Sequence, residues 1–250
     1  MLLIKELNLY KGTVSDISFD SKVINTVNAY SFNIAIKNIK FAEAIQTSDI
    51  LLPDGISIVW TAKLLYGNKL KKIAGADVFF YFMDILNRKS GKCFFLGSTN
   101  ETLNKIEYRQ KVEYPNVQLA KFSPPFKREF SDIDNMEMLE RINKFSPDVL
   151  FVGMTAPKQE LWVHEHKHKI KAKTICSIGA VFDFYAGTVN RAPIWMIDLG
   201  LEWLYRLVRQ PKRLWRRYLI GNTLFLFYII KELFFFKFCS LNSKKTSNSS

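Results

Sequence analysis

The chain has 250 residues, enough for one complete domain with a small appendage, and its hydrophobic content of 48% excludes a disordered protein. A formal net charge of +13 predicts an anionic partner: a nucleic acid, a nucleotide or the negatively charged face of a membrane. Three widely spaced cysteines are typical of reduced core thiols. Lys5 and Glu6 interrupt the first apolar run before a signal peptide could form, so we expect a cytoplasmic protein.

Strand-like apolar runs alternate with longer segments of helical period. The expected strands are 22–27, 49–52, 92–97, 116–122, 148–154 and 173–179. The expected helices lie near 32–46, 56–66, 76–89, 100–112, 134–145, 158–170 and 194–208. This alternation predicts an α/β, Rossmann-like domain over 1–200, with a mostly parallel sheet and helices on both faces. A basic and apolar helical appendage over 201–239 and a polar, disordered tail over 240–250 complete the expected organisation.

Ligands of such sheets bind beyond the carboxyl ends of the strands. These positions carry small and polar residues, which makes them candidate site residues: Thr26, Asn28, Asp54, Gly97, Gly153, Gly179 and Asp183. Asp54 follows an apolar strand and precedes an apolar helix in "LLPDGISIVW". Asp-Gly is also ordinary turn chemistry, and an aspartate can cap the next helix. A turn or cap and a catalytic carboxylate are therefore both open for Asp54.

Two further strand-to-helix junctions suit a ligand. In "FLGSTNETLNKI", exposed amide groups and the helix dipole favour a phosphate, although the G-x-G-x-x-G fingerprint of dinucleotide binding is absent. In "VGMTAPKQELW", Pro157 suits a first helical turn, and Gln159 and Glu160 lie close to it. Helix capping and ligand binding are both open for these two side chains.

Two patterns invite a metal site. His164, His166 and His168 are interleaved with lysines, and on a helix the middle ring points away from the other two, which favours a solvated face. Asp132 and Asp134 have the D-x-D spacing with which many sugar transferases hold a metal and a diphosphate. Acidic residues also complement the dipole of a first helical turn without any ligand. We therefore predict no metal and no cofactor.

The segment "SIGAVFDFYAGTVNRAPIWM" places Asp183 among aromatic residues. A carboxylate in such surroundings usually has a partner, because burying it alone is costly. An ion pair with Arg191 and a hydrogen bond from a ligand hydroxyl are the two alternatives.

The stretch "RLVRQPKRLWRRYLIGN" follows. Between residues 200 and 217, six basic residues stand against Glu202 alone, a net charge of +5. Four arginines step by 3, 4 and 3 residues, which aligns them on one helical stripe unless Pro211 breaks the helix. The apolar run 218–230 has 13 residues, short of the roughly 20 that a spanning helix needs. It suits a helix lying on anionic lipid or an ordinary terminal core helix.

Seven segments, in order, resemble the WecG/TagA/CpsF family of bacterial glycosyltransferases (glycosyltransferase family 26). They are "NTVNAYSF", "LLPDGISIVW", "KIAGADVF", "FFLGSTNETLNKI", "PDVLFVGMTAPKQELW", "SIGAVFDFYAGTVNRAPIWM" and "LGLEWLYRLVRQPKRLWRRYL". The resemblance extends from about residue 8 to about residue 222. Each motif is loose by itself, and the shared order makes the signal specific.

The resemblance implies an inverting transferase that moves an N-acetylmannosamine-type sugar from a UDP-sugar donor to a polyprenyl-diphosphate-linked sugar, without a metal. It implies cell-surface polysaccharide or teichoic acid synthesis by an enzyme held peripherally at the inner face of the bacterial cell membrane. Asp54 corresponds to the family's catalytic aspartate, and Thr26 and Asn28 to its Thr-x-Asn motif. Gln159 and Glu160 fall in its P-K-Q-E motif. The three arginines of its C-terminal appendage correspond to Arg206, Arg213 and Arg216.

The mechanism expected from these residues uses Asp54 as general base and arginines to stabilise the departing diphosphate. Arg217 and the apolar run 218–230 are expected to hold the enzyme at the membrane. One alternative is a basic α/β protein that binds nucleic acid or nucleotide, although no nucleic-acid motif supports it and we expect no nucleic-acid partner. Another is a membrane-associated protein that binds nucleotide without turnover. The exact sugar, the acceptor and the oligomeric state stay open, a homo-oligomer included.

Overall fold

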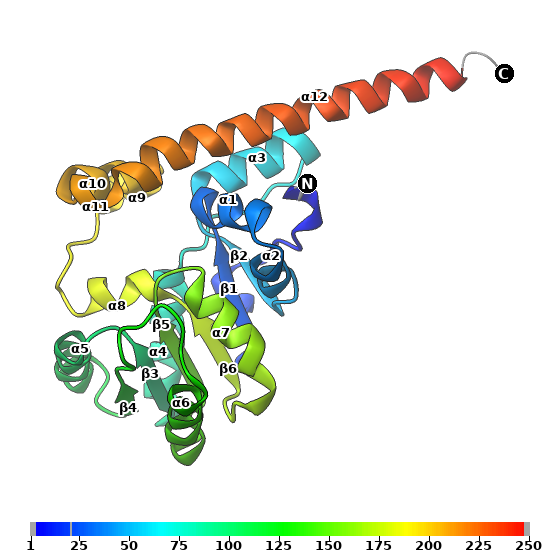
Figure 1. Cartoon of the computed structure of the whole chain (residues 1–250). Coiled ribbons are helices and arrows are strands. Elements are labelled where there is room, and N and C mark those ends of the chain that lie inside the picture. Colours follow the sequence, from blue (N-terminus) through cyan, green and yellow to red (C-terminus); the bar gives the residue numbers. More distant parts are fainter. Residues whose placement is uncertain (1–3, 21, 248–250) are drawn as a thin grey trace.

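The structure is a computed structural model that describes residues 4–20 and 22–247, with the backbone only from residue 235 onward (Figure 1). Within these residues, six parallel strands form one sheet in the order β2–β1–β6–β5–β3–β4. The strands are β1 (Val23–Val27), β2 (Ile50–Pro53), β3 (Lys92–Gly97), β4 (Gln118–Phe122), β5 (Val149–Gly153) and β6 (Thr174–Ser177). The α/β, Rossmann-like prediction is confirmed, and every strand lies within two residues of its expected bounds.

Helices connect and cover the strands. The first group is α1 (Ala29–Lys37), α2 (Ile39–Gln46), α3 (Ile56–Tyr66), α4 (Gly75–Lys89), α5 (Asn100–Glu113), α6 (Asp132–Phe145), α7 (Lys158–His166) and α8 (Gly179–Tyr185). The second group is α9 (Ile194–Asp198), α10 (Glu202–Arg209), α11 (Pro211–Trp215), a π-helical turn η4 (Arg216–Ile220) and α12 (Gly221–Ser247). Single 3-10 turns lie at Ile4–Glu6, Val14–Asp16 and Lys167–Lys169.

The core lies on both faces of the sheet because alternate side chains of a strand point in opposite directions. Phe95 and Phe151 pack together on the face covered by α4, α5 and α8, with ring centroids 5.3 Å apart. Their neighbours Phe94 and Leu150 pack under α6 and α7 on the other face. Strands buried on both sides explain why the expected strands are near-continuous apolar runs.

Three expected helices are divided in the structure. The helix predicted over 32–46 is two helices, because Asn38 ends α1 and its side-chain oxygen accepts the amide of Phe41 to cap α2. The helix predicted over 194–208 is broken at Gly200, which has φ +74°, a conformation that favours glycine. The helix predicted over 158–170 ends at His166 and continues as a 3-10 turn. The seven-residue α8 was not predicted, because its apolar run reads as part of a strand.

Helices α9 to α12 form a layer across one end of the sheet (Figure 1). Pro211 does break the basic helix: α10 ends at Arg209 and Pro211 begins α11, so the arginines do not share one continuous stripe. The final helix continues to Ser247, beyond residue 240 where a disordered tail was expected. No proline or glycine stops it there, and a helix satisfies its own backbone groups without tertiary contacts. Residues 248–250 lie outside the described residues.

Candidate active site

The carboxyl ends of β1 and β2 bring Asn28 and Asp54 together. Asn28 caps α1, with its side-chain oxygen accepting the amides of Tyr30 and Ser31 at 3.1 Å. The amide of Asp54 donates to the carbonyl of the residue before Asn28, at 2.9 Å. Gly55 has φ +145°, and a Cβ there would lie 3.4 Å from the Cβ of Asn28. The Thr-x-Asn and Asp-Gly motifs therefore meet in one turn, and Thr26 lies half-buried on the same strand end.

The half-buried carboxyl of Asp54 stands in unusual electrostatic surroundings. Burial, followed by the negative charge of Glu202, raises its pKa to about 7. Asp77 adds a smaller effect in the same direction, while the cations of Lys72 and Arg217 oppose it. Within the described residues, the Asp54 side chain accepts no hydrogen bond and forms no ion pair. A cap or turn role would need such a bond, so the geometry favours a carboxylate that is free to act on a ligand.

Gln159 and Glu160 are buried beside the same edge. The side-chain oxygen of Gln159 accepts the amides of Met154 and Gly179, both at 3.2 Å, and so ties the ends of β5 and β6 together. Its nitrogen donates to Oε1 of Glu160 at 2.9 Å. Oε2 of Glu160 is buried and has no hydrogen-bond partner among the described residues. Burial raises the pKa of this carboxyl to about 7, against the smaller opposing effects of the Gln159 hydrogen bond and the charge of Arg217. Neither side chain caps α7.

The three candidate glycines permit close backbone packing at this edge. A Cβ on Gly97 would lie 2.4 Å from the carbonyl oxygen of Gly153, and a Cβ on Gly153 would lie 2.4 Å from the ring of Phe182. A Cβ on Gly179 would lie 2.2 Å from the carbonyl oxygen of Met154. These contacts alone account for the absence of a side chain, and ligand contact at the three glycines stays a prediction.

Asp183 faces arginines of the appendage rather than Arg191. Burial raises the pKa of Asp183, and the charges of Arg213 and Arg206 oppose that effect. The guanidinium of Arg206 also lies 5.2 Å from the ring centroid of the neighbouring Phe184. Arg191 instead pairs with Asp77 at the start of α4, at 3.6 Å, so the Asp183–Arg191 pair weighed from the sequence is not formed. The appendage thereby extends the candidate site beyond the end of β6.

Arg217 is the arginine of the appendage whose positive charge lowers the pKa of Asp54, against the larger effect of burial. It is half-buried over Tyr30, with its guanidinium 4.4 Å from the ring centroid. Burial lowers the pKa of Arg217, and its Nε has no hydrogen-bond partner among the described residues. Arg216, by contrast, is exposed and lies over Trp215 at 5.3 Å. Arg217, which was expected to hold the membrane, therefore packs against the domain, and its membrane contact stays a prediction. Both residues belong to the π turn η4, a local feature that often marks functional sites.

One stripe of α12 is docked on the domain and holds this turn in place. The side chain of Asn33 donates to the carbonyl of Gly221 at 2.7 Å. Phe225 packs edge-on against Phe32, with ring centroids 5.5 Å apart, and is buried. Farther along, buried Glu232 accepts a hydrogen bond from the hydroxyl of Tyr66 on α3. The last helix is therefore a core helix along one side, while its other side exposes the apolar residues Leu226, Phe227, Ile230 and Phe234.

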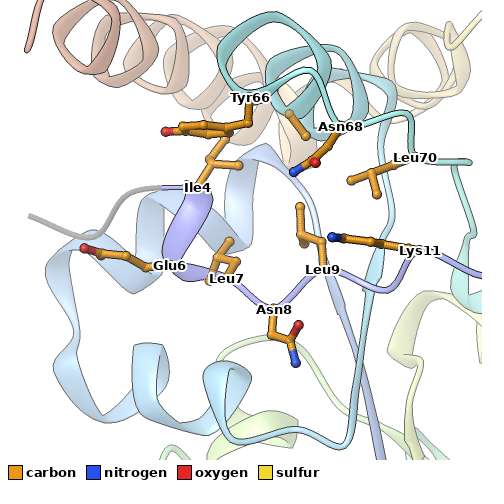
Figure 2. A pocket seen from close by; sticks show the side chains of 10 residues that line it. Ile4, Glu6, Leu7, Asn8, Leu9, Lys11, Tyr66, Asn68 and Leu70 are labelled. Atoms are coloured by element: carbon orange, nitrogen blue, oxygen red, sulfur yellow. The ribbon is translucent and has the colours of Figure 1, made fainter. Parts of the chain in front are cut away.

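A cavity of about 310 Å³ lies away from these residues, between the N-terminal segment and α3. Figure 2 shows its lining, which includes Leu7, Leu9 and Leu70 with the polar ends of Lys11 and Asn68. None of the candidate site residues lines it. The candidate site is thus identified by the raised pKa values of Asp54 and Glu160, and this cavity is not part of it.

Sequence reasoning did not assign to the site three charged residues that affect the pKa of Asp54: Glu202, Lys72 and Asp77. It also placed Arg217 at the membrane and not near Asp54. All these residues lie in the segments or the basic stretch already singled out, so the signal was present but unassigned. Lys72 is further held by a hydrogen bond to the carbonyl of Ile197, at 3.0 Å, which joins α9 to the same site.

Among the described residues, no three His, Cys, Asp or Glu side chains are grouped so that they could hold a metal. His166, expected on a solvated face, is buried and stacks on Trp162 with ring centroids 5.0 Å apart. Cys93 and Cys176 are buried free thiols, as predicted, and burial raises the pKa of both. The side chain of Cys239 lies outside the described residues.

Comparison with known proteins identifies the family of this chain. The family model described as "Glycosyl transferase WecG/TagA/CpsF family" matches residues 8–238. The chain belongs to this glycosyltransferase family. The resemblance seen in the seven motifs is thereby confirmed, and the alternative of a nucleic-acid-binding α/β protein loses its support.

Members of this family with assigned activities are similar over most of their length. A protein of Bacillus subtilis (strain 168) is 34% identical over 197 residues, which cover 79% of this chain and 75% of that protein. A protein of Staphylococcus aureus (strain MW2) is 28% identical over 214 residues, 86% of this chain and 82% of that protein. Both are named N-acetylglucosaminyldiphosphoundecaprenol N-acetyl-beta-D-mannosaminyltransferase. Within the described residues, no helix combines the length and the apolar character needed to cross a bilayer.

Proposed function

We propose that this glycosyltransferase moves an N-acetylmannosamine-type sugar from a UDP donor to a polyprenyl-diphosphate-linked N-acetylglucosamine, with inversion at the anomeric carbon. The names of the relatives support the transferred sugar and the acceptor. The observation that carries the proposal is Asp54: a carboxyl with a pKa of about 7 and no hydrogen-bond or ion-pair partner among the described residues, at the ligand-binding edge of the sheet and within the electrostatic influence of Arg217.

Asp54 serves as the general base. The acceptor hydroxyl oxygen attacks the anomeric carbon, its proton passes to the Asp54 carboxylate, and the bond from the anomeric carbon to the UDP oxygen breaks with its electron pair. A pKa of about 7 leaves a large ionised fraction near neutral pH and makes the carboxylate a stronger base than an ordinary aspartate. One carboxylate suffices, since a single displacement needs no covalent intermediate on the enzyme.

Guanidinium groups of the appendage stabilise the departing diphosphate. Arg206 and Arg213 act beside Asp183, and Arg217 acts between Asp54 and Glu160. Fixed cations aimed at developing negative charge are often the largest catalytic contribution, so we infer a transfer that needs no metal. Arg216 is retained as a candidate from the resemblance, although its exposed position over Trp215 gives it no described contact with Asp54 or Asp183.

Glu160 is the residue that we assign to the donor sugar. In the ionised form of Glu160, the unpaired Oε2 needs a hydrogen-bond donor, which a sugar hydroxyl or acetamido N–H supplies and an ionised phosphate does not. The unpaired Nε of Arg217 needs an acceptor, which suits a phosphate or hydroxyl oxygen. The two residues therefore favour a donor placed with its hexose toward Glu160 and its diphosphate toward Arg217. Thr26, Asn28, Gln159 and Arg191 are supporting candidates at the same edge.

The proposed roles of these residues divide the chain into a catalytic domain and a C-terminal appendage. We infer that residues 1–200 carry the base and the donor-sugar pocket, and that residues 201–239 complete the site with cations and hold the enzyme peripherally at the inner membrane face. Removing 201–250 takes the cations and the outer stripe of α12 away together. We expect little transfer from the remaining domain to a lipid-linked acceptor, and undiminished transfer would contradict this division.

A UDP-release screen tests the proposed function. Several UDP-sugars are each incubated with a short-chain lipid-diphosphate-N-acetylglucosamine acceptor, with and without EDTA. We expect acceptor-dependent UDP release from UDP-N-acetylmannosamine or a close analogue, unchanged by EDTA. Absence of release from every UDP-sugar would sink the transferase assignment, while release abolished by EDTA would sink only the metal-free mechanism.

A further inference from the structure

The helix that follows Asp54 exposes a large apolar stripe. Trp60 and Leu64 are one turn apart on α3 and are 62% and 69% exposed. The opposite side of α3 is buried in the core through Ile58 and Ala62. Single exposed apolar residues are common on protein surfaces, so this stripe indicates a binding surface only if neighbouring elements also expose apolar or charged residues.

Both ends of α3 are bordered by the C-terminal layer. At its start, Ile56 lies so close to Gly200 that a Cβ on that glycine would come within 2.6 Å of it. At its end, Tyr66 is hydrogen-bonded to Glu232 of α12. Figure 1 shows α3 beside α12, with α9 and α10 farther along the same layer. The C-terminal layer that borders α3 exposes apolar residues of its own, on and just after α9 and on α12: Ile194, Trp195, Leu199, Leu226, Phe227, Ile230 and Phe234.

Basic residues accompany this apolar surface. Lys63 is exposed on α3 between Trp60 and Leu64. Arg209, Lys212, Arg213 and Arg216 are exposed on the α10–η4 segment, whose stretch from 200 to 217 carries a net charge of +5. Exposed apolar residues on neighbouring helices, accompanied by cations, are typical of an interaction site, and this combination matches a bilayer that presents acyl chains beneath anionic headgroups.

We propose that α3, α9 and the outer stripe of α12 form one docking face that seats the enzyme on an anionic lipid bilayer. The catalytic domain thus takes part in docking through Trp60 and Leu64, in addition to the appendage. Asp54 lies two residues before the start of α3 at Ile56, so docking through α3 brings the chain segment that carries the base close to the bilayer surface, where a lipid-linked acceptor is presented. This inference rests on the proposed function for the identity of the acceptor.

Vesicle binding by two matched double variants tests the docking face. Trp60→Ser with Leu64→Ser removes the α3 stripe, and Tyr108→Ser with Val112→Ser removes an aromatic and an aliphatic residue at the same spacing on α5, where they are 76% and 70% exposed. Each full-length protein is floated with vesicles of phosphatidylcholine alone or mixed with phosphatidylglycerol. We expect about tenfold or greater loss of binding to the mixed vesicles for the α3 variant and no loss for the α5 variant. Wild-type binding should weaken without phosphatidylglycerol.

Transfer to a water-soluble short-chain acceptor is measured in parallel and should be unchanged in the α3 variant, which also shows that it is folded. Unchanged vesicle binding by the α3 variant would overturn the docking face. A shift of that variant from dimer to monomer in sedimentation, with vesicle binding intact, would assign the surface to a second copy of the chain and would overturn it too. Lost vesicle binding in a protein that releases UDP with no acceptor would leave docking supported and remove the proposed function.

Discussion

Two aspartates at the starts of helices have opposite surroundings. Asp134, in the first turn of α6, accepts hydrogen bonds from Lys127 and from the amide and hydroxyl of Ser131, all near 2.8 Å. The Lys127 bond, followed by those of Ser131, lowers its pKa to about 2. Asp54, before α3, has no such bond among the described residues, and burial raises its pKa to about 7.

This difference separates a structural carboxylate from a functional one. A carboxylate with several donors is stabilised in its charged form and contributes a cap to its helix. A carboxylate that is buried without donors costs stability in its charged form, and such a cost is typical of sites that bind or react with a ligand. Residue type and nearness to a helix start do not distinguish the two, since both are aspartates at strand-to-helix or loop-to-helix junctions.

The largest expected effect comes from Asp54→Asn. Losing the base should lower transfer by about 10²–10⁴-fold while UDP binding, measured by calorimetry, is retained. Because the folded-state pKa of Asp54 is raised, ionisation costs stability as the pH rises from about 4 toward 7. The variant should therefore be at least as stable as the parent at pH 8. Asp134→Asn is the matched control and should transfer normally. Full activity of Asp54→Asn would remove it as base.

Arg217→Met should have the next largest effect. Removing a cation from the developing charge should lower the turnover rate by about 10²–10³-fold. Arg216→Met changes the adjacent residue, which is exposed, and should alter turnover by no more than a few fold. The reverse order, with Arg216→Met the more damaging, would show that the π turn presents its arginines differently when substrate is bound.

Glu202→Gln should move a pH profile without abolishing transfer. The negative charge of Glu202 helps to raise the pKa of Asp54, so its removal lowers that pKa. The acidic limb of the activity profile should shift to lower pH. Asp198→Asn, a charge change in the neighbouring helix, should leave the limb in place. A profile that does not move with Glu202→Gln would separate Glu202 from the site.

The smallest effect is expected for Asp134→Asn, which should change the stability of the fold but not the rate of transfer. A lowered carboxyl pKa stabilises the fold above the ordinary value of about 4, and this contribution is lost as the pH falls toward 2. The midpoint of thermal unfolding should drop slightly at neutral pH and should approach that of the parent as the pH falls toward 2. An equal drop at both pH values would mean that packing, and not charge, is responsible.

The sheet and most of the site's composition were predictable from the sequence. Apolar runs such as "DVLFVG" identify strands buried on both faces, and parallel strands must bring their carboxyl ends to one edge. Asn28 and Asp54 follow from that rule because each lies just after a strand, and Gln159 follows because it lies in the first turn of the helix that succeeds β5. The breaks at Asn38 and Gly200 were missed, since helical period continues across both positions.

The directions of the appendage arginines were not predictable. Arg217 turns inward because a π turn precedes α12 and because α12 is anchored by Asn33, a residue 188 positions away from its partner Gly221. A helical period extrapolated through this stretch groups Arg206, Arg209, Arg213 and Arg216 on one stripe and leaves out Arg217. Contacts between distant parts of the chain decided which cation reaches the site.

The pH dependence of kcat/KM for UDP-sugar transfer to a short-chain acceptor tests the central claim most directly. If Asp54 is the base, activity must rise as its carboxyl ionises, with an acidic limb at about pH 7. The limb should disappear from the residual activity of Asp54→Asn. A profile that is flat from pH 5 to 8, or a limb near pH 4 where an ordinary aspartate ionises, would contradict the account.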